Sequence, residues 1–97
     1  MAYTSELLSR HRSDIVATAA RHGARSVRVF GSVARGDAVE SSDVDFLVDM
    51  DEEATLFDRA ALIVELRQLL GCDVDVVTQK ALKPRVRERV LAEAVPL

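Results

Sequence analysis

The sequence of 97 residues is poor in aromatic side chains, lacks tryptophan and contains one cysteine, Cys72. With 4% aromatic residues, a platform that stacks the bases of single-stranded nucleic acid is not expected. A lone cysteine forms neither an intramolecular disulfide nor a two-cysteine zinc site, and it is compatible with a reducing compartment. Residues 1–12 lack the apolar core of a signal peptide, and no segment approaches the roughly 20 apolar residues of a membrane span. We therefore expect a cytoplasmic protein that does not enter a membrane.

Positive charge is not in excess either, because 13 Lys and Arg face 16 Asp and Glu, for a net charge of −3. This balance argues against a protein that coats nucleic-acid backbones. The charges are nevertheless segregated. Eight acids lie between positions 37 and 53, whereas positions 80–89 hold five basic residues and one acid. Each run is typical of a solvated face, and the basic run could alternatively dock an acidic partner or nucleic acid.

The hydrophobic fraction of 48% is enough for one globular domain, and we expect a single domain over residues 1–97. Apolar residues at helical or alternating spacing, and glycines that end helices, predict three helices and three strands. In chain order these are a helix over 5–22, strands over 26–30 and 43–49, a helix over 55–70, a strand over 73–78 and a helix over 82–95. The helix over 55–70 should begin at an approximate capping box, in which Asp58 follows Thr55 by three residues, and end before Gly71. This order predicts an α+β fold, an α/β sandwich in which helices cover one small sheet.

A glycine–serine turn lies where the first strand should end. Gly31 would let a ligand approach the backbone, and amide donors at a following helical turn can bind phosphate. Ser32 adds a hydroxyl donor, and Arg35, which precedes Gly36, could pair with a terminal phosphate. Alone, this segment also fits an ordinary connection between a strand and a helix, and it matches neither a P-loop nor a dinucleotide fingerprint.

Two aspartates occupy the second predicted strand two positions apart. Asp43 and Asp45 should therefore share one face, while Val44 and Phe46 point into the core. Carboxylates about 4 Å apart repel by about 4 kcal/mol at an effective dielectric constant of 20, so a cation is expected between them. Mg²⁺ or Mn²⁺ suits such hard oxygen ligands. An exposed edge strand with two solvated aspartates is the alternative for this pattern alone.

The third predicted strand repeats the two-residue spacing with Asp73 and Asp75. If it lies beside the second strand, one of these acids can complete a group of three carboxylates, and Asp75 fits better because buried valines flank it. A third carboxylate can accept a proton from an attacking hydroxyl. A phosphate-binding turn, a metal-binding pair and a third acid together predict phosphoryl or nucleotidyl transfer.

These segments resemble the signature of the polymerase-β-like nucleotidyltransferase superfamily, and the short chain is similar to its minimal nucleotidyltransferase (MNT) branch. The segments that carry the resemblance are Gly31-Ser32, Arg35-Gly36, Ser42-Asp43-Val44-Asp45 and Val74-Asp75-Val76. The resemblance implies a small mixed sheet packed against helices and an active enzyme.

The resemblance also implies roles for individual residues. Gly31 and Ser32, with Gly36 in the same turn, would hold the phosphates of ATP, and Arg35 would contact the triphosphate. Two Mg²⁺ ions, with Mn²⁺ as an alternative, would be held by Asp43, Asp45 and Asp75, and Asp75 would also activate the nucleophile.

Members of this branch are often antitoxins that transfer AMP from ATP to a tyrosine hydroxyl of a HEPN ribonuclease toxin encoded by a neighbouring gene, and so inactivate it. The resemblance therefore implies a toxin partner, and either a hetero-oligomer or a homodimer fits it. Two other functions stay open on sequence grounds. One is a non-catalytic antitoxin that binds and occludes its toxin, and the other is nucleotidyl transfer to a small molecule or an RNA end.

Overall fold

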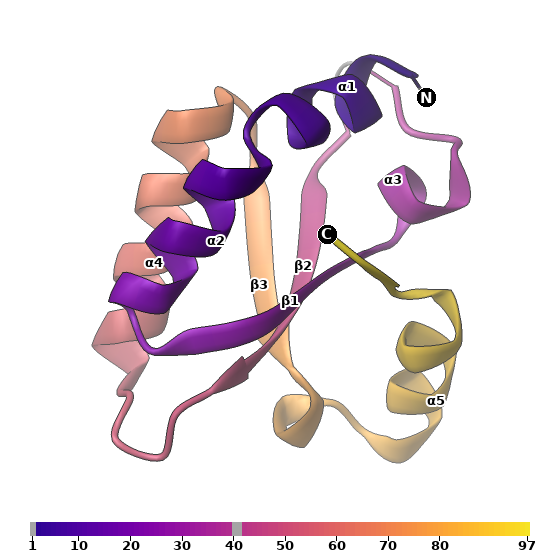
Figure 1. The fold of residues 1–97 in the computed structure, drawn as a ribbon. Coiled ribbons are helices and arrows are strands. Elements are labelled where there is room, and N and C mark those ends of the chain that lie inside the picture. Colours follow the sequence, from indigo (N-terminus) through magenta and orange to yellow (C-terminus); the bar gives the residue numbers. More distant parts are fainter. Residues whose placement is uncertain (1, 40–41) are drawn as a thin grey trace.

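The computed structural model describes residues 2–39 and 42–97 and contains a mixed four-stranded sheet (Figure 1). The strands follow the order β3-β2-β1-β4 across the sheet. β2 runs antiparallel to β1 and parallel to β3, and β4 pairs antiparallel with the other edge of β1. Their bounds are β1 (Ala24–Phe30), β2 (Val44–Met50), β3 (Val74–Thr78) and β4 (Val95–Pro96). The predicted α+β class with helices against one small sheet is confirmed.

The helices divide between the two faces of this sheet. α2 and α4 lie side by side on one face, whereas α5 lies apart from them on the other side (Figure 1). The bounds are α1 (Ala2–Arg10), α2 (Arg12–Arg21), α3 (Ser32–Arg35), α4 (Leu56–Leu70) and α5 (Pro84–Glu93), with a 3₁₀ turn, η1, at Gln79–Ala81. None of the helices in the described residues is long and apolar enough to cross a membrane.

The core lies between the sheet and the α2–α4 layer. Val44 and Phe46 of β2 are fully buried at 0% exposure and belong to one cluster with Ile15 of α2 and Leu62 of α4. Because side chains alternate along a strand, this inward set leaves Asp45 on the opposite face. The alternation predicted for Val44, Asp45 and Phe46 is therefore confirmed, although the strand runs over Val44–Met50 and begins one residue later than the predicted range of 43–49.

The prediction of one helix over residues 5–22 is wrong, because the chain forms α1 and α2 with a break at His11. His11 has non-helical backbone angles (φ −104°, ψ 13°). Leu8 and Ile15 are both buried, but residues 9–14 between them contain no apolar side chain. This stretch has nothing to hold a straight helix against the core, so the chain can bend there.

The strand predicted over 26–30 begins two residues earlier, at Ala24. Ser26 adopts a positive φ of 54°, and the pairing with β2 is irregular between Arg25 and Arg28. Such a bulge inserts a residue into the strand and breaks the strict alternation of side chains. The apolar pattern therefore identified only the part of β1 after the bulge.

The start and stop signals of α4 are confirmed. The hydroxyl of Thr55 accepts a hydrogen bond from the Asp58 amide, the Asp58 carboxylate accepts one from the Thr55 amide, and Gly71 ends the helix in the left-handed region. This capping box satisfies two amides that the first helical turn would leave unpaired.

The last helix is shorter than the predicted range of 82–95. It begins at Pro84, whose ring disfavours helical angles in the preceding residue, and Lys83 is extended accordingly (φ −66°, ψ 150°). After Glu93 the chain leaves the helix and Val95 pairs with Val29 as β4. β4 was not predicted, because a two-residue edge strand has no periodicity of its own.

Candidate active site

The ends of three neighbouring strands bring the predicted site residues together. Asp45 of β2 is the direct partner of Phe30 of β1 on one side and of Asp75 of β3 on the other. Gly31 follows Phe30, so the glycine–serine turn begins beside Asp45. The condition set for a third carboxylate, that the third strand lie beside the second, is met.

Gly31 forms the turn from β1 into α3 and lies against Asp45. Its backbone angles (φ 78°, ψ −153°) fall in a region that is essentially restricted to glycine. A Cβ atom at this position would overlap Oδ2 of Asp45 and lie 3.2 Å from its Cγ. The carbonyl of Gly31 accepts a hydrogen bond from the Arg35 amide at 3.0 Å. The predicted helical turn is therefore present, and glycine permits its close approach to the carboxylate.

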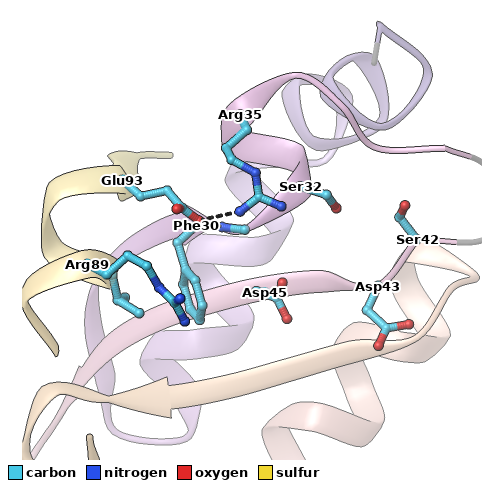
Figure 2. A pocket seen from close by; sticks show the side chains of 10 residues that line it. Phe30, Ser32, Arg35, Ser42, Asp43, Asp45, Arg89 and Glu93 are labelled. Carbon is cyan, nitrogen blue, oxygen red and sulfur yellow. Dashed lines mark hydrogen bonds and ion pairs between the residues drawn. The ribbon is translucent and has the colours of Figure 1, made fainter. Parts of the chain in front are cut away.

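A cavity of about 480 Å³ opens at this junction (Figure 2). It is lined by the predicted residues Gly31, Ser32, Arg35, Asp43 and Asp45. Two predicted residues lie outside the described lining. Gly36 ends α3 in the left-handed region, and Asp75 lies next to Asp45 in the sheet with 56% of its side chain exposed.

The sequence did not predict that α5 contributes to this cavity. Arg89, Val90 and Glu93 line it, and Glu93 contacts the turn directly. Its Oε1 accepts a hydrogen bond from the Gly31 amide at 2.6 Å and another from Nη1 of Arg35 at 3.0 Å. Figure 2 shows the Arg35 and Glu93 side chains meeting above Asp45. No local motif marks Glu93, because its position depends on how α5 folds back over the sheet.

The surroundings of Asp45 disfavour its ionised form. The pKa of Asp45 is raised, first by its burial and then by the negative charges of Asp75 and Asp43. Arg35 is held by two carboxylates: the pKa of its guanidinium is raised, mainly by the hydrogen bond to Asp37 and the charge of Asp37, with a smaller contribution from Glu93. The site thus holds negative charge that a bound cation would stabilise.

The donor set fits a hard divalent cation, because Asp45 and Asp75 offer carboxylate oxygens at paired positions of β2 and β3, and Asp43 adds another just before β2. In the described residues, however, no three acidic, histidine or cysteine side chains converge closely enough to hold one ion. Oδ1 of Asp75 accepts a hydrogen bond from the Val76 amide at 3.0 Å and lies 4.0 Å from Nη2 of Arg59. Convergence on one ion therefore requires at least one of these side chains to move.

A mixed sheet that presents acids on adjacent strands beside a glycine–serine turn defines a nucleotidyltransferase-type fold and site. Residues 13–97 match the family model described as nucleotidyltransferase domain. The chain belongs to this family and is a nucleotidyltransferase, as the sequence predicted.

Individual relatives agree with this assignment. The chain is 40% identical over 89 residues to protein adenylyltransferase MntA of Thermococcus cleftensis, covering 92% of this chain and 87% of the relative. A solved structure described as a candidate minimal nucleotidyltransferase is 53% identical, with a TM-score of 0.86, covering 95% of this chain and 94% of that one. A toxin–antitoxin structure with AMP-PNP has a TM-score of 0.75 at 21% identity, covering 87% of this chain and 69% of that one. At that identity the likeness shows the fold alone.

Proposed function

We propose that this nucleotidyltransferase is a protein adenylyltransferase that transfers AMP from ATP to a tyrosine hydroxyl of a HEPN ribonuclease toxin, and so acts as its antitoxin. The observation that carries the proposal is the pairing of Asp45 with Asp75 beside the Gly31 turn. The relative named protein adenylyltransferase supports the choice of AMP and of a protein acceptor, and the fold shared with a toxin–antitoxin structure supports a toxin partner. The predicted cytoplasmic location and the single domain over 1–97 are parts of this proposal.

The nucleotide would bind with its phosphates at the Gly31 turn. The Gly31 amide, the Ser32 hydroxyl and the Arg35 guanidinium line the same cavity and can donate hydrogen bonds to phosphate oxygens. Gly36 would contribute indirectly, by ending α3 so that Arg35 faces the cavity. Asp43, Asp45 and Asp75 would hold Mg²⁺, or Mn²⁺ in its place, which when bound neutralises phosphate charge.

In the proposed reaction, the tyrosine oxygen attacks the α-phosphorus of ATP. A new bond forms between that oxygen and the α-phosphorus, while the bond from the α-phosphorus to the oxygen bridging to the β-phosphate breaks. Pyrophosphate leaves, held by the Gly31 amide and Arg35, and the tyrosine proton passes to the carboxylate of Asp75 and then to water. The exposed side chain of Asp75 suits this role, because an acceptor on another protein must reach it.

Labelling of the toxin tests this proposal. The purified chain, the product of the neighbouring gene, Mg²⁺ and ATP labelled at the α-phosphate should yield a labelled toxin whose mass grows by AMP units. The double variant Asp43→Asn with Asp45→Asn should lower the labelling rate by roughly 100-fold or more, since even indirect support of a metal ligand is worth 10- to 100-fold.

A matched control lies on the same strand. Asp49→Asn makes the same chemical change in β2, at a residue that lines a different cavity, and it should label the toxin normally. Labelling that survives the double change would refute the roles of Asp43 and Asp45. If the double variant still protects cells from the toxin, occlusion is sufficient. Labelling of RNA or a small molecule in place of the toxin would refute the proposed acceptor.

A further inference from the structure

Glu93 occupies the donors that the proposed phosphate site requires. One carboxylate oxygen accepts hydrogen bonds from both the Gly31 amide and the Arg35 guanidinium, and the side chain is only 18% exposed. These are the main-chain and side-chain donors that would hold the phosphates of a nucleoside triphosphate. A carboxylate and a phosphate oxygen are both anionic acceptors that favour the same charge-assisted geometry. Glu93 therefore stands where a phosphate oxygen would bind.

The Glu93 carboxylate and a phosphate of the nucleotide compete for these donors. The Gly31 amide has one hydrogen to donate, and three carboxylates, those of Asp43, Asp45 and Glu93, already line the cavity. A triphosphate would add more negative charge beside them. A phosphate oxygen that accepts the hydrogen bond of the Gly31 amide would therefore displace Glu93 from it.

The helix that carries Glu93 is lightly attached to the sheet. Of the ten residues of α5, all of which the structure describes, Val90 alone is buried. In the first half of the helix, Arg87 donates hydrogen bonds to the carbonyls of Gln79 and Leu82 at 3.1 and 3.0 Å, so these bonds hold α5 to the segment before it. Arg89, one helical turn before Glu93, lines the same cavity and could pair with the displaced carboxylate. The Glu93 side chain can therefore leave without exposing the core.

We infer that Glu93 is a built-in competitor of the triphosphate, which occupies the Gly31 amide and Arg35 in the free enzyme and is displaced when nucleotide binds. The inference rests on the proposed function, because it assumes that the phosphates bind at this turn. Glu93 would therefore lower the affinity of the enzyme for the nucleotide. In the free enzyme Glu93 keeps the donors satisfied, and in the bound enzyme the phosphates take its place.

Glu93→Gln distinguishes competition with the nucleotide from a role in which Glu93 holds the Gly31 turn and Arg35 in place for binding. The amide keeps the length of the side chain but removes its charge, so it competes less well for the two donors. We expect Glu93→Gln to bind the Mg²⁺ complex of α,β-methylene ATP, whose α–β link is not cleaved, about tenfold more tightly than the wild type in calorimetric titration. Glu93→Asp keeps the charge but falls one methylene short, so it should also bind more tightly than the wild type. The control is Glu88→Gln, the same change at an exposed residue of α5 outside the described cavity lining, which should bind like the wild type.

The outcomes distinguish the inference from the proposed function. Equal or weaker binding by Glu93→Gln, with normal binding by the wild type, would overturn the inference alone. If no variant binds the nucleotide, the proposed function fails and the inference with it. The amide resonance of Gly31 gives a second measurement. It should move on Glu93→Gln substitution without nucleotide and should coincide in both proteins at saturation, and a Gly31 resonance that is identical in the two free proteins would also refute the contact.

Discussion

At the scale of single residues, Gly31 determines how close the turn can come to the acids. Its backbone lies in a region that other residues avoid, and the space for a Cβ is taken by the Asp45 carboxylate. A non-glycine residue at position 31 would therefore strain the backbone and also overlap the Asp45 carboxylate with its Cβ. A side chain at position 31 therefore changes both the stability of the turn and the position of a proposed metal ligand.

Gly31→Ala should lower the free energy of unfolding by about 1–3 kcal/mol, the cost of a non-glycine residue in such a sparsely populated backbone region. It should also reduce transfer activity per folded molecule, because Asp45 must move to admit the methyl group. Urea unfolding followed by circular dichroism measures the first effect, and toxin labelling at a temperature well below the melting transition measures the second.

Gly71→Ala is the matched control for this substitution. Gly71 also has a positive φ, of 68°, but no atom lies within 4 Å of a Cβ built there. It should lose about 1 kcal/mol of stability, the cost of the left-handed conformation, and keep its activity. If the two alanine variants lose activity equally, the loss reflects instability and the contact between Gly31 and Asp45 is not its cause.

At the scale of secondary-structure elements, a carboxylate of α4 joins the two helices that cover the core. Glu65 accepts a hydrogen bond from Nη2 of Arg21 at 3.0 Å and a second one from the ring of His22. The pKa of Glu65 is lowered, first by the hydrogen bond from Arg21 and then by that from His22. The bridge therefore favours the ionised carboxylate in the folded protein.

The lowered pKa fixes the pH range in which this bridge stabilises the fold. A carboxyl group with a depressed folded pKa contributes stability above its ordinary value of 4.5, and this contribution is lost as the pH falls through the lower folded value. Glu65→Gln should therefore be less stable than the wild type at neutral pH, and the difference should shrink as the pH falls below 4.5. Urea unfolding at a series of pH values measures this difference.

A second variant provides the control for this test. Glu52→Gln changes an exposed acid outside the helix pair, and its stability should follow the wild-type pH dependence. A difference between wild type and Glu65→Gln that stayed constant from neutral to acidic pH would show that the charge of Glu65 does not stabilise the helix pair.

At the scale of the whole molecule, the features that the sequence predicted are local. The capping box of Thr55 and Asp58, the alternation around Asp45 and the turn at Gly31 each depend on neighbours within a few residues. The break at His11 and the strand β4 depend on what the rest of the chain packs against them. Glu93 reaches Gly31 across 62 positions, so no spacing rule could identify it.

The distribution of charge over the molecule leads to a final prediction. The net charge is only −3, but Asp45 of β2 lies near Asp43 and Asp75, and burial together with the negative charges of these two acids raises the pKa of Asp45. Removing one of these charges should stabilise the protein when no divalent ion is present, because the folded state then holds less uncompensated negative charge. The same substitution should remove the stabilisation of the folded protein by Mg²⁺.

We therefore expect Asp45→Asn to melt at a higher temperature than the wild type in chelator, because the substitution removes a partly buried charge that two neighbouring acids disfavour. Saturating Mg²⁺ should stabilise the wild type, by about 2.7 kcal/mol at 100 times the dissociation constant, and should leave Asp45→Asn almost unchanged. Thermal unfolding with and without Mg²⁺ measures both effects. Asp49→Asn serves as the control and should respond to Mg²⁺ like the wild type. An equal response of Asp45→Asn would mean that the ion binds elsewhere, because stabilisation by a ligand requires a site that the folded state retains.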